Sequence, residues 1–384
     1  MTSLIDIVSF PSRREEAWKY TPVDEIVASL RDAVAGAAPP VSPSTVDELA
    51  GDLGCPRLVF VNGVFVPDAS DCVLPDGVIL DLTPGKRQRR EDVDGFRALN
   101  NAAPTDTANL VVRADVAVPE AIHLVHLSAP SDLRTVSHPR TVVDVGEGAR
   151  VALVETYGGL PGPAFTNAST TIRAGREAAV DHVRIQSEGD ETVHVGHTLV
   201  EQGAASTTRL TSVMIGADIA RHALDVRLAG PDAGADLDGL YLPARRQRHD
   251  NVVTVDHTAS GGRSAQRYLG VVDDHGRGSF SGHVIVRAGT VGNDATQVNR
   301  NLVLTKTAEA DTRPWLEIFA DDVRCTHGAT VGRLDDDALF YLRSRGIPVA
   351  VGRAMLIDAF IREIVDDITD AALRSHLANV MAAR

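Results

Sequence analysis

The chain has 384 residues, a formal net charge of −14 and only 4% aromatic residues. An acidic chain lacks the basic face that a nucleic-acid backbone requires, so we expect no nucleic-acid partner. Three cysteines without a CxxC pair argue against a disulfide framework, and neither a secretory leader nor an apolar run of transmembrane length is visible. We therefore expect a cytoplasmic protein that does not span a membrane.

Residues 1–105 are predicted to form a mostly helical, mixed α/β region. The clearest local signal is Asn62-Gly63, which separates two runs of β-branched and aromatic residues within 57–67. This pattern is typical of a β-hairpin with a two-residue type I′ turn. Helical segments are expected after a capping box at 12–15, over 24–34, from Thr45, and in part of 81–103.

Residues 106–334 are rich in short β-branched segments that Gly, Asp or Asn separate. Two architectures fit this texture: a β-sandwich or barrel, and a right-handed parallel β-helix whose coils are short strands. Small β-branched residues and glycines at the expected corners favour the β-helix, although no fixed repeat length can be extracted. The predicted fold class is mainly β with α-helical ends: a right-handed parallel β-helix core between an N-terminal mixed α/β region and a C-terminal helical subdomain.

Residues 335–384 are predicted to form that helical subdomain. Asp335 is placed as the N-cap of a first helix, which Gly346 and the following proline end. A second helix carries an apolar stripe over 355–368, and a third begins near Thr369. The stripe fits two roles, because it could dock a partner or pack on the β core of the same chain.

Cys325 and His327 are the one cysteine–histidine pair with the spacing of metal ligands. In an extended strand, residues two apart point to the same face, so their thiol and imidazole would lie together. These groups suit a soft or borderline metal, or an iron–sulfur fragment. Such sites use roughly four protein ligands, so either a partner completes the set or the pair is structural.

Other readings of these residues stay open. Cys325 could be a buried structural cysteine with a hydrogen-bonded histidine beside it. A cysteine nucleophile is also conceivable, but no orienting Asn or Asp motif and no oxyanion loop accompanies it. The histidines outside this pair are interpreted as surface or ladder residues.

Acidic pairs raise the question of a carbohydrate-active β-helix enzyme, which would use carboxylates on the coil surface. Adjacent carboxylates on a strand point to opposite faces, so we interpret these residues as turn residues and a helix N-cap. The pairs are Asp273-Asp274, Asp321-Asp322 and the run Asp335–Asp337. No phosphate-binding glycine motif is present, so any ATP site would lie on another chain.

Several segments together resemble the SufB/SufD family. The longest is the run from Ala308 to Gly332, which contains Cys-Thr-His-Gly-Ala-Thr, followed by 339–347. Shorter matches are 16–22 (Glu-Ala-Trp-Lys-Tyr-Thr-Pro), 61–63, 256–262 and 299–304. The resemblance covers nearly the whole chain. The Cys-Thr-His-Gly-Ala-Thr segment and the N-terminal Trp-Lys-Tyr-Thr-Pro segment distinguish this chain from SufB. A SufB chain is expected to be longer and to carry a Cys-Glu-His segment instead.

The resemblance implies a non-catalytic scaffold subunit of the SufBCD iron–sulfur cluster assembly complex. It implies that the end of the β-helix pairs with SufB, and that the helical tail docks SufC, the ATPase of the complex. It also implies that Cys325 and His327 contribute to a transient cluster or iron shared with SufB, with none bound stably by the isolated chain. The rival hypotheses are a carbohydrate-active β-helix enzyme and a homodimeric interaction protein without a metal role.

Overall fold

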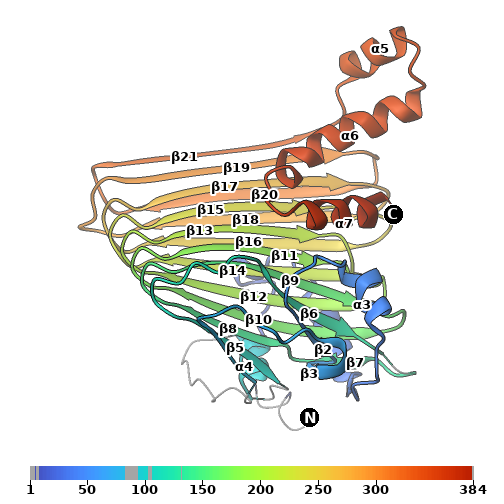
Figure 1. The fold of residues 1–384 in the computed structure, drawn as a ribbon. Coiled ribbons are helices and arrows are strands. Elements are labelled where there is room, and N and C mark those ends of the chain that lie inside the picture. The colour runs from blue at the N-terminus through green and yellow to red at the C-terminus, as the bar shows by residue number, and fades with distance from the viewer. Residues whose placement is uncertain (1–4, 6–7, 83–93, 103–105, 131, 383–384) are drawn as a thin grey trace.

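The computed structural model describes the chain except residues 1–4, 6–7, 83–93, 103–105, 131 and 383–384. Its core is a flattened solenoid of two sheets (Figure 1). The 11-stranded sheet contains β1 (Val34–Ala35), β4 (Val78–Asp81), β5 (Thr107–Val112), β7 (Thr135–Ser137), β8 (Arg140–Val145), β10 (Ala164–Ala174), β12 (Thr192–Gln202), β14 (Ile219–Leu228), β16 (Arg248–His257), β18 (Arg277–Val286) and β20 (Glu309–Ile318). The 10-stranded sheet contains β2 (Arg57–Val61), β3 (Val64–Phe65), β6 (Ile122–Ser128), β9 (Arg150–Gly159), β11 (Ala179–Gln186), β13 (Thr207–Met214), β15 (Gly234–Tyr241), β17 (Arg263–Val272), β19 (Asn293–Val303) and β21 (Val323–Gly332).

Each coil gives one strand to each sheet, so from β8 onward every strand pairs in parallel with the strand two further on. Arg248 in β16, for example, lies between Ile219 of β14 and Arg277 of β18. Side chains that bond across neighbouring coils are commonly 29 residues apart, as are Arg221 and Asp250. This topology confirms the parallel β-helix and excludes the β-sandwich or barrel.

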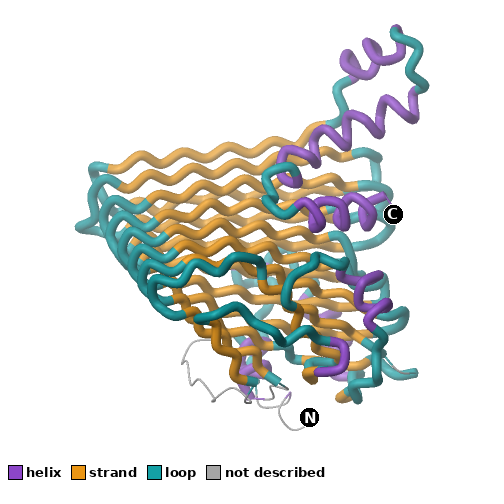
Figure 2. Tube along the Cα trace, viewed as in Figure 1, coloured by secondary structure: helices purple, strands orange, loops and turns teal. Residues whose placement is uncertain are grey.

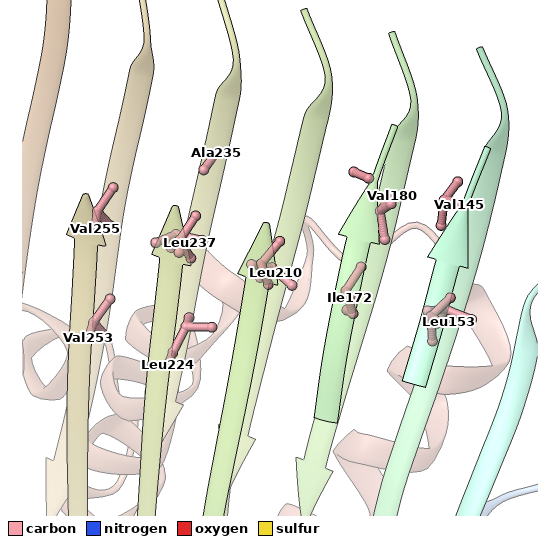
Figure 3. Close-up of a cluster of buried hydrophobic side chains, with 14 of the residues drawn as sticks. Val145, Leu153, Ile172, Val180, Leu210, Leu224, Ala235, Leu237, Val253 and Val255 are labelled. Atoms are coloured by element: carbon pink, nitrogen blue, oxygen red, sulfur yellow. The ribbon is translucent and has the colours of Figure 1, made fainter. Parts of the chain in front are cut away.

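The core lies between the two sheets and consists of stacked aliphatic columns. Leu224 stands beside Val253, and Val226 beside Val255, on successive coils. All four are at most 2% exposed, and Leu237 faces them from the other sheet (Figure 3). Alternation along each strand sends every second side chain into this interior, which explains why small β-branched residues dominate the sequence.

One corner of each coil, up to the turn between β18 and β19, is closed by a residue in the left-handed backbone region. These residues include Gly148, Glu177, Ala205, Asp232 and Gly261, with φ between 53° and 72°. The turns stack along one side of the solenoid (Figure 2), and the N–H of Ala205 donates to the carbonyl of Pro231 at 2.8 Å. The corner requires a left-handed backbone conformation, and several residue types adopt it here. No repeated residue type therefore marks the corner in the sequence.

Part of the N-terminal region packs on the outer face of the 11-stranded sheet, through side chains such as Ile26 and Phe96, and part on the 10-stranded sheet, through Val46. Its helices are η1 (Glu16–Trp18), α2 (Val23–Arg31), α3 (Pro43–Ala50), η2 (Pro67–Ala69) and α4 (Gly95–Ala102). The hairpin at Asn62-Gly63 is confirmed, with φ of 49° and 77° and Val61 paired with Val64. The helix expected after 12–15 is only the three-residue turn η1. Part of the helix expected in 81–103 is α4, and the rest of that range includes residues outside the described ones.

The C-terminal helices are α5 (Asp336–Ser344), α6 (Val349–Val365) and α7 (Ala371–Ala382). The Asp335 carboxylate accepts from the N–H groups of Asp337 and Ala338 at 2.9 and 3.1 Å, which confirms the N-cap. The end of α6 and all of α7 lie on the outer face of the 10-stranded sheet, where Ile364 and Leu377 are fully buried. By contrast, α5 buries no side chain and projects from the end of the solenoid (Figure 1). No described helix is long and apolar enough to cross a bilayer.

Candidate functional site

The candidate site lies on β21, the last strand of the 10-stranded sheet. Its inner edge pairs with β19, which places Cys325 beside Ala295 and His327 beside Gln297. No other strand of the described residues pairs with the outer edge of β21, or with the outer edge of β20 in the other sheet. Both sheets therefore end at the same place with free backbone donors and acceptors, and we call this place the open end.

Cys325 is half-buried and packs against the core between the sheets. Because β21 is a regular strand across Val323–Gly332, His327 follows on the same face, while Thr326 between them faces outward. His327 is exposed, since no further coil covers it. The strand therefore presents a thiol at the end of the core and an imidazole at its rim.

Burial raises the pKa of the Cys325 thiol, and the negative charge of Asp294 adds to the rise. A hydrogen bond with the backbone of Ala295 opposes both effects but does not cancel them. The thiol therefore carries its proton near neutral pH. A metal ion must displace that proton before the sulfur becomes a ligand, so binding releases a proton.

Thiolate and imidazole are donors that iron and iron–sulfur clusters accept, so the chemistry of the pair fits such a cargo. The pair is nevertheless incomplete. Among the described residues, no group of three or more His, Cys, Asp and Glu side chains is arranged to hold a metal ion. Cys325 and His327 supply two donors, fewer than the roughly four protein ligands that such sites use.

A second polar cluster, which the sequence analysis did not single out, lies deep inside the solenoid. The Glu155 carboxylate is completely buried and accepts hydrogen bonds from the hydroxyls of Thr141 and Thr170 at 2.8 and 2.9 Å. The Nε2 atoms of His126 and His182 lie 3.6 and 3.4 Å from its two oxygens. Burial alone would raise the pKa of Glu155, but the two histidines reverse that effect and hold it well below its usual range.

Most of the scattered histidines are not at the surface, which corrects that part of their interpretation. Eight of those outside the pair are at most 4% exposed: His123, His126, His138, His182, His194, His222, His249 and His257. Inside-facing positions follow from the two-residue alternation once the strand register is known. The acidic pairs behave as expected, since Asp274 occupies a turn with φ of 52° and Asp335 caps α5.

The fold defines a class: a parallel β-helix, here with a cysteine and a histidine on the strand at its open end. Residues 126–360 match the family described as "SUF system FeS cluster assembly, SufBD core domain". The chain belongs to this SufBD family of iron–sulfur cluster assembly proteins.

Individual relatives agree with this assignment. The chain is 31% identical to the Escherichia coli iron-sulfur cluster assembly protein SufD, over 96% of this chain and 87% of the relative. It is 32% identical to a SufBD family protein of Synechocystis, over 99% and 89%. A SufBD family protein of Mycobacterium bovis is 30% identical over 97% and 89%.

Proposed function

We propose that this chain is a non-catalytic, SufD-like scaffold subunit of a cytoplasmic SUF assembly complex. In this proposal it pairs with a SufB-type subunit at the open end, and the two share a nascent cluster or iron. A SufC-type ATPase docks on its C-terminal helices and supplies the energy of ATP hydrolysis. In this proposal residues 106–334 form the β-helix core that pairs with the SufB-type subunit, and residues 335–384 dock the ATPase. Residues 1–105 form the N-terminal region.

The observation that carries this proposal is the position of Cys325 and His327 on an unpaired edge strand. A strand with a free edge is a template for a strand of another molecule, and such pairing would bring foreign side chains beside both donors. An incomplete ligand set also suits a cargo that must be released, because a complete set would retain the product.

The docking of an ATPase is supported by exposed apolar side chains on α5 and the first half of α6. Phe340 is 69% exposed, Tyr341 58% and Met355 47%. The other half of the stripe packs on the sheet, with Phe360 only 8% exposed. Packing on the chain's own sheet therefore accounts for one half of the stripe, and the exposed half is the face that we propose for a partner.

His327→Ala is expected to lower the iron and sulfide content of the anaerobically reconstituted complex by about tenfold or more, because it removes one of few ligands. Thr326→Ala is the matched control, since its side chain lies on the same strand but faces the other way. Size-exclusion chromatography checks that the complex stays intact. An intact His327→Ala complex that assembles as much cluster as wild type would contradict the ligand role. Cluster assembly by a homodimer of this chain alone would contradict the SufB-type pairing.

Phe340→Asp combined with Tyr341→Asp is expected to weaken binding of the ATPase subunit by at least about tenfold, because a charge would be buried in an apolar interface. Isothermal titration with the purified subunit measures the change. Val291 lies between β18 and β19 and is 55% exposed, so Val291→Asp is the control for a charge introduced at an exposed apolar position elsewhere. Deletion of 335–384 is a poorer test, because it would uncover the sheet beneath α6 and α7. Equal affinity of wild type and the double variant would refute the docking face.

A further inference from the structure

An amide ladder runs through the interior of the last coils and ends beneath His327. Gln266 in β17 pairs in register with Gln297 in β19, which pairs in register with His327 in β21. The Nε2 of Gln297 donates to the Oε1 of Gln266 at 3.0 Å. Both glutamines are at most 1% exposed. Stacked side chains of this kind face the same interior column on successive coils.

The ladder has a direction. Since Gln297 lies nearer the open end and donates to Gln266, the acceptor oxygen of Gln266 faces toward the open end. By the same reasoning, the Oε1 of Gln297 is the acceptor available to the next residue of the ladder, which lies on β21. This oxygen is buried and has no hydrogen-bond partner among the described residues. An unsatisfied buried acceptor costs about 1–3 kcal/mol, and the residue on the next rung is His327.

The position of the Gln297 carboxamide is built into the fold. Opposite it, in the other sheet, stands Gly282 of β18. A Cβ atom at position 282 would lie 1.7 Å from Nε2 of Gln297, so only glycine leaves room for the amide. The same Cβ would lie 2.7 Å from the ring of Phe280. Gly282 therefore provides the space that the carboxamide occupies between the two sheets.

We propose that Gln297 is a positioning residue that selects the tautomer and orientation of His327. In this arrangement the exposed ring of His327 turns inward, so that one ring N–H donates to the Oε1 of Gln297, which has no partner in the part of the chain that the structure describes, and the other ring nitrogen keeps its lone pair directed out of the open end. A neutral histidine binds a metal only through a nitrogen without a proton, and the hydrogen bond of the other nitrogen decides which one that is. The consequence for the cargo rests on the proposed function, in which His327 is a ligand.

The first test uses the isolated chain and needs no metal. In histidine ¹⁵N-labelled protein at pH 8, His327 is expected to give the nitrogen shifts of a single tautomer and a slowly exchanging ring N–H. The resonance is assigned by its loss in His327→Gln. In Gln297→Leu the ring N–H is expected to exchange with solvent at least about tenfold faster, because its acceptor is gone. Gln297→Glu keeps an acceptor oxygen and should restore the slow exchange, which a purely structural role would not predict.

Thr296→Val, an exposed position on the same strand, is the control and should leave the His327 signals unchanged. Circular dichroism confirms that each variant is folded. Identical shifts and exchange of His327 in wild type and Gln297→Leu would overturn the proposal. Slow exchange lost in Gln297→Leu and not recovered in Gln297→Glu would overturn it as well.

The second test uses the reconstituted complex. Gln297→Leu is expected to weaken iron retention against a competing chelator by about 10–100-fold, the usual effect of losing a residue that orients a metal-ligating histidine. Gln297→Glu should regain at least part of it. If His327→Ala has no effect on assembly, the proposed function fails while the tautomer result still stands. If His327→Ala matters but Gln297→Leu retains iron like wild type, the positioning role alone fails.

Discussion

Arg221→Met is expected to destabilise the docked N-terminal region by about 3–5 kcal/mol, the usual cost of removing one partner of a buried ion pair. Arg221 is 2% exposed and is paired with the Asp250 carboxylate on the next coil. Its guanidinium also donates to the hydroxyl of Thr21 at 2.9 Å and lies 3.7 Å from the ring centre of Trp18. Methionine would leave the Asp250 charge buried and without its cation.

Tryptophan fluorescence during urea unfolding measures this effect. The chain has two tryptophans, so a Trp315→Phe background leaves Trp18 as the only reporter. Arg248→Met is the matched control on the same face, because the Arg248–Glu25 pair is exposed and worth no more than about 1 kcal/mol. A loss in Arg221→Met no larger than that in Arg248→Met would contradict the prediction. The double variant Arg221→Met, Asp250→Leu should recover part of the loss, since no buried charge then remains.

The solenoid is expected to lose stability steeply as the pH falls from about 6 toward 4. Burial lowers the pKa of His123 to about 3 and those of His138 and His257 to about 4. In the unfolded chain these rings titrate near pH 6.5. Between those values the unfolded state binds more protons, so stability rises with pH and falls on acidification. Three such groups together change the free energy of unfolding by up to about 4 kcal/mol per pH unit near pH 5.

Urea unfolding at pH 7, 6 and 5 measures the slope. His138→Gln should reduce it by roughly 1.4 kcal/mol per pH unit, the value for one group. His275→Gln, which alters an exposed ring, should leave it unchanged. A free energy of unfolding that stays constant from pH 7 to pH 5 would show that these buried rings accept protons without unfolding.

Features that depend on a few neighbouring residues were predictable from the sequence. The Asn62-Gly63 turn and the Asp335 cap follow from local backbone and side-chain chemistry, and both are present. The β-helix could be favoured by residue type, but its repeat could not be found. The corner turns accept Glu177, Ala205 and Asp232 alike, so the period lies in backbone shape and not in a motif.

Relations between coils could not be predicted, because they depend on strand register. The Cys325–His327 pair was visible since both residues share one strand. Its neighbour Gln297 lies 30 positions earlier than His327, a relation that only the pairing of β19 with β21 fixes. In the same way, nothing local distinguishes the buried Glu155 from the exposed glutamates, because the side it faces is decided by coils on either side of it.

The two ends of the solenoid differ in the length of backbone they leave unpaired. At the first end the outermost described strands are β3, with two residues, and β4, with four, and both run antiparallel to their neighbours. At the other end β20 and β21 each expose ten residues. A long free edge recruits another strand, whereas a short one does not. When a second molecule adds at the long edges, as in the proposed pairing, only the short antiparallel edge strands remain exposed at the outer ends. Assembly would therefore stop at a pair of molecules and would not propagate into a filament.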